Sequence, residues 1–98
     1  MHTYVILRRS GWRSPDDLEE AGARSAKVGD EEMSDRIRWI RSYALEEDGG
    51  TVGTVCVYQA ESPEAIREHA SLAELPVDEI IPVADTVIVR PDPEPASA

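Results

Sequence analysis

The fold is decided by the stretch Val55–Ala70, which reads VCVYQAESPEAIREHA. Its first residues are β-branched or aromatic, which is typical of a strand. Ser62 can then cap a helix with its hydroxyl, and Pro63 suits the first helical position, where a missing N–H group costs nothing. The stretch therefore predicts a strand that runs directly into a helix. It also holds the side chains best suited to catalysis or metal binding: Cys56, Tyr58 and His69.

Length and charge limit the classes of function. The chain has 98 residues, which predicts one domain, residues 1–90, followed by a Pro-rich tail, residues 91–98, that we expect to be extended or disordered. The formal net charge of −10 argues against nucleic-acid binding, because a phosphate backbone needs neutralising Lys and Arg side chains. The single cysteine cannot form an internal disulfide, and no apolar run approaches the roughly 20 residues of a membrane span. We therefore expect a cytoplasmic protein that binds neither nucleic acid nor membranes.

Similar signals along the chain predict four strands and two helices. The pair Ser14-Pro15 repeats the cap-and-proline pattern, and the turn-like run Glu46–Gly50 separates two alternating segments. Gly53 in the second of these segments is expected to mark a bulge. The predicted elements are a strand over His2–Arg8, a helix from Pro15 to a point between Val28 and Met33, strands over Ile37–Leu45 and Thr51–Gln59, a helix over Ser62–Ala73 and a last strand over Ile80–Arg90 that Pro82 interrupts.

The order β-α-β-β-α-β is that of the ferredoxin-like α+β fold, a four-stranded antiparallel sheet with both helices on one face. Alternation along Ile37–Leu45 places Trp39 and Tyr43 on the same, heavier face of their strand. Two helices with small buried residues cannot cover the apolar side chains on both faces of such a sheet. We therefore expect a homodimer through the open sheet face, of the dimeric α+β barrel type.

Further short motifs are Trp39-x-x-Ser42-Tyr43, Cys56-Val57-Tyr58 followed by Ala60, and Ala65-Ile66-Arg67-Glu68-His69-Ala70. Together with Tyr4-Val5-Ile6 and Leu75-Pro76-Val77, they resemble a small bacterial family of uncharacterised ferredoxin-like proteins. The match runs from about Thr3 to Val89. One member of that family is described as a nickel-binding protein, so the resemblance implies a dimer with nickel bound at or near its surface, and no established enzymatic activity.

His69 and His2 are the candidate metal ligands. Imidazole suits nickel, copper and zinc, and His69 lies inside the matching motif on the predicted second helix. Ala65, one turn earlier, offers no second ligand, so a metal at His69 needs donors from elsewhere in the chain or from a second copy. The alternative is a boundary histidine that is hydrogen-bonded to a neighbour. His2 can chelate nickel together with a terminal amine and a peptide nitrogen. Nickel is the one cofactor expected.

The aromatic side chains also predict an interior pocket for a small hydrophobic ligand. Tyrosine hydroxyls in an apolar cavity supply polar handles, although core packing with satisfied hydroxyls explains the same residues. Cys56 is interpreted as a small buried hydrophobic residue, because nothing in the sequence places a base beside it. The residues predicted to line the pocket are Tyr4, Trp39, Tyr43, Cys56, Tyr58 and His69.

Three functions remain open from the sequence. The first, which we favour, is a small cytoplasmic nickel-binding protein. The second is a cofactor-free isomerase, cyclase or monooxygenase in which His69 acts as a base and Tyr58 or Tyr43 polarises an oxygen, by analogy with other dimeric α+β barrels. The third is a module whose acidic surface and Pro-rich tail dock to a partner.

Overall fold

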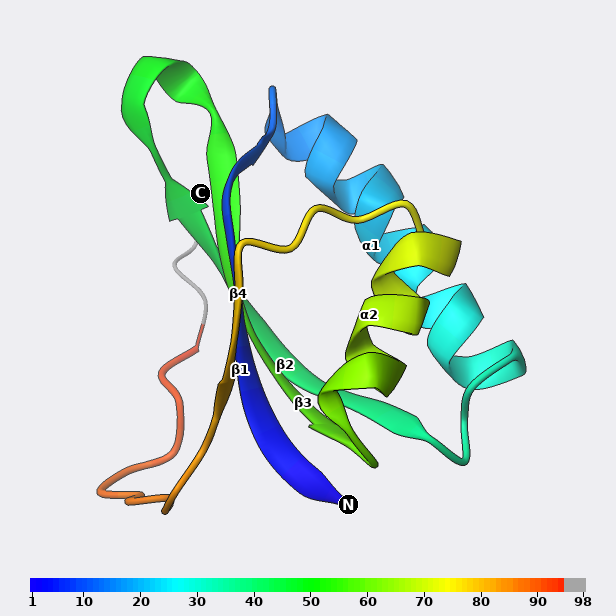
Figure 1. The fold of residues 1–98 in the computed structure, drawn as a ribbon. Coiled ribbons are helices and arrows are strands. Elements are labelled where there is room, and N and C mark those ends of the chain that lie inside the picture. The colour runs from blue at the N-terminus through cyan, green and yellow to red at the C-terminus, as the bar shows by residue number, and fades with distance from the viewer. Residues whose placement is uncertain (95–98) are drawn as a thin grey trace.

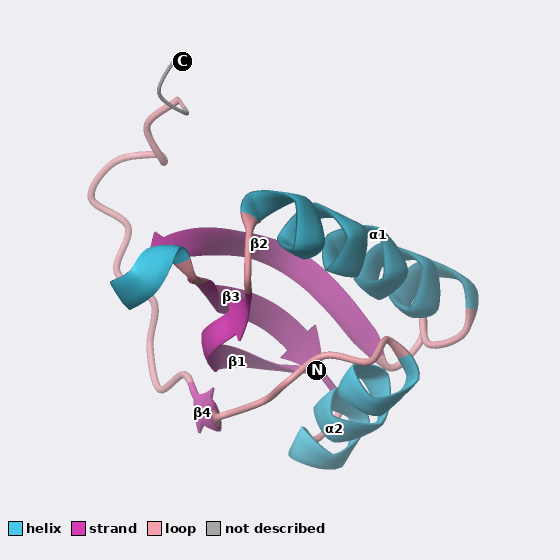
Figure 2. Ribbon diagram, turned by 90° about the horizontal axis from the view of Figure 1, so that it is seen from above, coloured by secondary structure: helices cyan, strands magenta, loops and turns pink. Residues whose placement is uncertain are grey.

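The computed structural model describes residues 1–94. Helices α1 and α2 cover one face of a sheet, and the C-terminal segment runs past the other face (Figure 1, Figure 2). The elements in chain order are β1 (His2–Trp12), α1 (Pro15–Glu31), β2 (Ile37–Glu46), the short 3-10 helix η1 (Asp48–Gly50), β3 (Val52–Ala60), α2 (Pro63–Leu72) and β4 (Glu79–Pro82).

The sheet has the order β2-β3-β1-β4, and its neighbouring strands are all antiparallel. With the chain order β-α-β-β-α-β, this is the predicted ferredoxin-like α+β fold. Both helices begin where the capping residues predict. The hydroxyl of Ser14 accepts a hydrogen bond from the N–H of Asp17 at 3.3 Å, and that of Ser62 accepts one from Ala65 at 3.2 Å. A proline follows each cap, so local chemistry sets both helix starts.

The core lies between the sheet and the two helices. Along β1 and β3, side chains that point toward the helices are buried, and most of those between them are half-buried. From α1 the buried side chains are small or medium in size (Ala21, Ser25 and Val28), which lets the helix approach the sheet closely. The apolar core cluster consists of Tyr4, Ile6, Val28, Met33, Ile37, Cys56, Tyr58, Ala60, Ala65, Ile66 and Ala73.

β1 is longer than predicted because it continues past Arg8 through a bulge. Its register with β3 is regular up to Arg8, opposite Thr54, and resumes at Trp12, opposite Val52. The intervening residues of β1 therefore lie opposite Gly53, so the predicted irregularity falls in the partner strand. A Cβ atom on Gly53 would lie 2.5 Å from the carbonyl oxygen of Arg8, too close for any side chain.

Glu47 holds this bulge in place from the loop between β2 and β3. Its carboxylate accepts hydrogen bonds from the guanidinium of Arg9 and from both the backbone N–H and the hydroxyl of Ser10. Ser10 has a φ of 46°, a left-handed conformation that costs free energy for a residue other than glycine. The bond from Arg9, followed by the bonds from Ser10, lowers the pKa of Glu47, so the carboxylate stays ionised and the bulge stays closed at neutral pH.

A second bulge overturns one prediction about β2. Trp39 pairs with Tyr58, and Arg41 pairs with Val57, the residue just before Tyr58 in the chain. Ile40 is therefore the extra residue of the bulge. The alternation of β2 therefore inverts at Ile40. The prediction that Trp39 and Tyr43 share a face is wrong: Trp39 lies on the helix side, whereas the Tyr43 hydroxyl donates a hydrogen bond to Asp92 of the C-terminal segment at 2.9 Å.

The last strand is shorter than predicted. β4 pairs with β1 only over Glu79–Pro82, and one further backbone bond joins the N–H of Val83 to the carbonyl of Thr3 at 2.9 Å. The prediction of a strand up to Arg90 is wrong, because the partner strand β1 begins at His2, and the register leaves residues beyond 84 with no strand to pair with. Residues 83–94 contain no helix or strand, and residues 95–98 of the predicted tail lie outside the described part.

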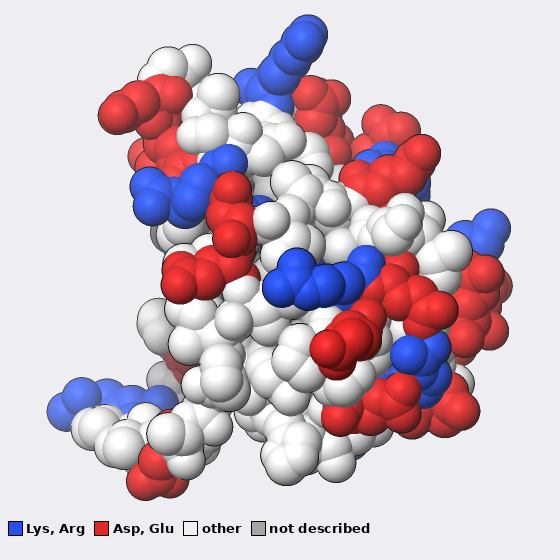
Figure 3. Space-filling view, viewed as in Figure 1, with Lys and Arg blue, Asp and Glu red and all other residues white. Residues whose placement is uncertain are grey.

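Charge is unevenly spread over the surface. Asp and Glu side chains gather over the two helices, interspersed with Lys and Arg, whereas uncharged side chains dominate around the edge formed by β4 (Figure 3). Within residues 1–94, no helix is long and apolar enough to cross a membrane.

Gly53→Ala should lower the free energy of unfolding by about 1–3 kcal/mol, because the new methyl group would collide with the backbone of β1. Gly29→Ala is the matched control. Its Cβ would meet its nearest neighbour at 3.7 Å, an ordinary contact, and alanine favours a helix, so stability should rise by roughly 0.5–1 kcal/mol. Urea unfolding of both variants measures the difference, and equal midpoints would contradict the close approach at Gly53.

Candidate functional site

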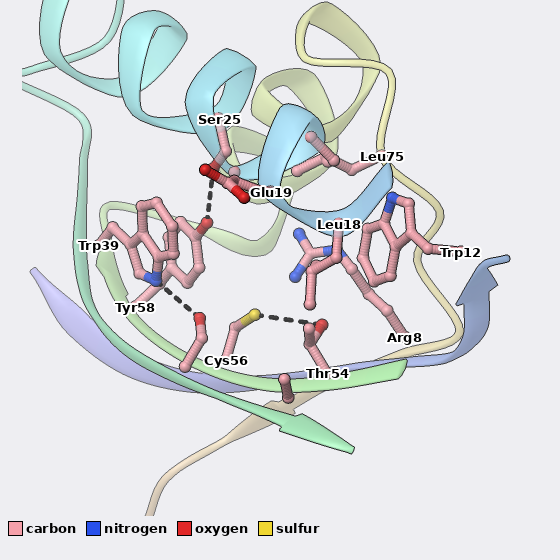
Figure 4. Close-up of a pocket in the computed structure, with 14 residues that line it drawn as sticks. Arg8, Trp12, Leu18, Glu19, Ser25, Trp39, Thr54, Cys56, Tyr58 and Leu75 are labelled. Carbon is pink, nitrogen blue, oxygen red and sulfur yellow. Dashed lines mark hydrogen bonds between the residues drawn. The ribbon is translucent and has the colours of Figure 1, made fainter. Parts of the chain in front are cut away.

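A cavity of about 250 Å³ lies between the sheet and α1 (Figure 4). Its floor comes from β1, β2 and β3, its roof from α1, and one side from the segment that follows α2. Most of its lining is apolar, and Trp12 and Trp39, the chain's two tryptophans, both contribute. The lining residues are Arg8, Trp12, Leu18, Glu19, Ala21, Gly22, Ser25, Trp39, Ser42, Ala44, Thr54, Cys56, Tyr58 and Leu75.

Arg8 is the buried charge of this cavity. It continues the helix-facing side of β1 after Tyr4 and Ile6, and the residue is 1% exposed. Its guanidinium rises from the sheet toward α1 (Figure 4), with its central carbon 5.9 Å from the centroid of the Tyr58 ring. Within residues 1–94, the Nε and Nη2 atoms of Arg8 are buried and have no hydrogen-bond partner.

Tyr58, Ser25 and His69 form a chain of hydrogen bonds that crosses from the sheet to both helices. The hydroxyl groups of Tyr58 and Ser25 are 3.0 Å apart, and the Nε2 atom of His69 is 3.0 Å from the backbone carbonyl oxygen of Ser25. A carbonyl can only accept, so Nε2 carries the proton and Nδ1 carries the lone pair. The rings of Tyr58 and His69 meet edge to face, with centroids 5.5 Å apart.

Burial determines how these groups titrate. Desolvation is the main cause that lowers the pKa of His69, and the positive charge of Arg8 adds to it, while the bond to Ser25 opposes it in part. Desolvation also raises the pKa of Tyr58, against the opposing effect of the Ser25 hydroxyl. Both side chains are therefore neutral at pH 7, which suits their burial.

A second cavity, of about 180 Å³, lies on the other side of this chain of hydrogen bonds. It shares Ser25, Trp39 and Tyr58 with the first cavity, and His69 and Asp30 also line it. Trp39 stacks on Tyr58 with the ring planes 9° apart, and its indole N–H donates to the hydroxyl of Ser42 at 2.7 Å. The Trp39–Tyr58 pair therefore forms a wall between the two cavities.

The predicted site residues fall into separate places. Cys56 and Tyr58 line the first cavity with Trp39, and His69 lies behind Tyr58 on the second cavity. Tyr4 is buried in the core, and its strand position pairs with Tyr58. Tyr43 lies on the opposite face of the sheet, away from this group. His2 is exposed at the start of β1.

Two important residues of this region were missed in the sequence. Arg8 continues the alternation of Tyr4 and Ile6, so its helix-facing position was predictable from the period of two. Ser25 lies on the buried face of α1, but no local pattern distinguishes a serine that joins two other elements from one that merely packs well.

The donors for a metal are few. Among the described residues, no group of three His, Cys, Asp or Glu side chains is placed to hold a metal ion. Nδ1 of His69 has a free lone pair, yet this atom is buried and no solvent reaches it. The donors that the described chain brings together therefore do not fit a complete nickel site.

The geometry of His69 and Tyr58 also does not resemble an acid–base pair. Nε2 of His69 bonds the backbone oxygen of Ser25 and the Tyr58 hydroxyl bonds the Ser25 hydroxyl, so these atoms do not converge on a shared substrate position. The first cavity is better equipped for binding than for proton transfer.

Comparisons with known proteins agree with this fold. Residues 4–83 match the family described as "Nickel responsive protein SCO4226-like". Among solved structures, the chain is similar to SCO4226 from Streptomyces coelicolor A3(2), with a TM-score of 0.66 and 17% identity, over 87% of this chain and 99% of that chain. No curated protein matches the chain. At this level of identity the structural match supports the fold alone.

The depressed pKa of His69 predicts that the protein loses stability as the pH falls. The unfolded histidine has a pKa near 6.5, above that of the folded state, so the unfolded chain binds the proton more tightly. The contribution of His69 is therefore complete above about pH 7.5 and declines as the pH falls through 6.5 toward the folded pKa. Urea unfolding between pH 8 and pH 5.5, with EDTA present, should show a steeper loss for the wild type than for His69→Gln. Parallel pH profiles for the two proteins would refute this prediction.

Proposed function

The chain belongs to the SCO4226-like family of nickel responsive proteins, and on that basis we propose that it is a cytoplasmic nickel-binding protein that works as a homodimer. The observation that carries this proposal is the family match over residues 4–83. The cavities add no rival with equal support, because Ser25 already engages the Nε2 atom of His69 and the hydroxyl of Tyr58, and Nδ1 of His69 is buried.

The open sheet face supports the proposed homodimer. Pairs of apolar residues line this face, with Val5 beside Val57 and Ile81, and Tyr43 beside Val55. Next to it, the C-terminal segment holds three apolar residues in the open, Val87, Ile88 and Val89, with exposed fractions of 83%, 75% and 77%. Apolar side chains exposed to this extent are typical of surfaces that become covered. A second copy would bury both groups at once.

A homodimer would also add donors for nickel. One described chain brings fewer than three suitable side chains together at any point, whereas nickel prefers four or more donors. His2 is an exposed imidazole, and the acidic surface supplies carboxylates. His69 is buried, so its Nδ1 atom becomes available only if α2 moves. We therefore favour His2 over His69 as the accessible imidazole of a site completed by carboxylates and by the second copy.

Nickel titrated calorimetrically into tag-free protein should bind saturably, with a dissociation constant below about 10 μM. His2→Gln should weaken this binding about tenfold, since one of few imidazole donors is lost. His69→Gln is the matched control and should bind nickel like the wild type. Loss of binding in His69→Gln alone would move the site to α2, and no saturable binding to the wild type would refute the proposal.

The homodimer is tested by Val57→Lys, which places a charge at the centre of the open sheet face. Sedimentation should show a dimer for the wild type and a monomer for this variant, because burying an unpaired ammonium group costs several kcal/mol. Ala23→Lys makes the same change in charge on the exposed surface of α1 and should remain dimeric. A wild-type monomer at about 100 μM would contradict the dimer and, with it, a nickel site completed by the second copy.

A further inference from the structure

The buried guanidinium of Arg8 lacks a counter-charge, and this sets it apart from other arginines of the chain. Arg9, Arg24, Arg36 and Arg41 all pair with carboxylates at the surface. Arg8, by contrast, is 1% exposed and forms no ion pair within residues 1–94. A buried charge without a partner costs several kcal/mol. This cost indicates that a ligand supplies the missing negative charge.

The free atoms of Arg8 define the shape of that partner. Nε and Nη2 are two buried nitrogens without partners, and they lie on the same edge of the guanidinium. Their N–H groups point in parallel, which is the arrangement that both oxygens of one carboxylate accept together. Arg8 and Thr54 both line the first cavity, and the guanidinium of Arg8 rises into the space between the sheet and α1 (Figure 4).

The walls of the cavity define the rest of the ligand. Trp12, Leu18, Trp39 and Leu75 surround the space with aromatic and aliphatic surface. At about 250 Å³ the cavity lies just below the usual range of roughly 300–1,000 Å³ for drug-sized ligands, so it suits a small molecule. An apolar body of one ring or a short branched chain would contact these walls while its carboxylate reaches Arg8.

Charge restricts the ligand further. The cavity holds one buried cation, and its single lining carboxylate, Glu19, is exposed on α1. A dianion such as phosphate would leave one charge unpaired among apolar walls and would also face the net charge of −10. We propose that the cavity between α1 and the sheet binds a small apolar monocarboxylate, held by the guanidinium of Arg8. This site is independent of the proposed nickel site.

The first experiment compares acids with neutral amides of the same shape on the wild-type protein. Cyclohexanecarboxylate and benzoate should bind roughly 10- to 100-fold more tightly than cyclohexanecarboxamide and benzamide, as a charge-assisted pair with arginine implies. Calorimetry measures the affinities, and the NMR signals of the two indole N–H groups locate the ligand, because both tryptophans line the cavity. Equal affinities for acid and amide, or no saturable binding of the acids, would overturn the proposal.

The second experiment removes the guanidinium. Arg8→Met keeps an unbranched side chain of similar length and should lose the preference for acids over amides, while its melting temperature stays equal or rises, since a buried unpaired charge is gone. Arg67→Met on the exposed surface of α2 is the matched control and should keep that preference. An unchanged preference in Arg8→Met would overturn the proposal, and the comparison of ligands on the wild type tests it even if this variant fails to fold.

Glu19→Gln distinguishes an external ligand from an internal one. If Glu19 serves as the partner of Arg8 in solution, the wild type will bind no acid and Glu19→Gln will bind it at least about tenfold better, which would overturn the proposal. Acid binding that changes less than about threefold in Glu19→Gln supports an external carboxylate.

Discussion

The structure depends on the hydrogen bonds that meet at Ser25. Its hydroxyl bonds Tyr58 of β3, and its backbone oxygen bonds His69 of α2, so one residue of α1 joins the sheet to both helices. All three side chains are buried, where an unmade hydrogen bond would cost roughly 1–3 kcal/mol. This cost fixes the position of α1 over the sheet and thereby creates the two cavities on either side of Tyr58.

The close approach of the paired strands β1 and β3 at Gly53 defines the other end of the larger cavity. Gly53 lets the two strands approach closely, and the bulge that follows Arg8 turns Trp12 back toward α1. Arg8 is the last residue before this irregularity, so its side chain still follows the regular alternation into the core. A long cationic side chain thus ends beneath α1 among apolar neighbours, with Tyr58 beside it. The same strand geometry explains both the cavity and its buried charge.

The family and the geometry inform different parts of the function. Membership in the nickel responsive family points to a role connected with nickel, while the described residues of one chain place no three donors together. Under our proposal, the family membership and the small number of donors in one chain agree if the metal is bound where two copies meet. The open sheet face and the exposed residues Val87–Val89 offer a surface for that contact. The cavity under α1 lies on the opposite side of the sheet and is available for a different ligand.

The sequence by itself determined the order of elements, the helix starts and the fold class. Caps and prolines act through contacts of three or four residues, so Ser14-Pro15 and Ser62-Pro63 specify the helices locally. Runs of β-branched and aromatic residues likewise indicate β1 and β3. Only the tertiary structure decided which face Tyr43 takes, where β4 ends, and that Arg8, Ser25 and His69 share one region. Each of these depends on a bulge, a sheet edge or a contact between residues far apart in the chain. Such features arise from packing between elements, whose energies no local window of residues contains.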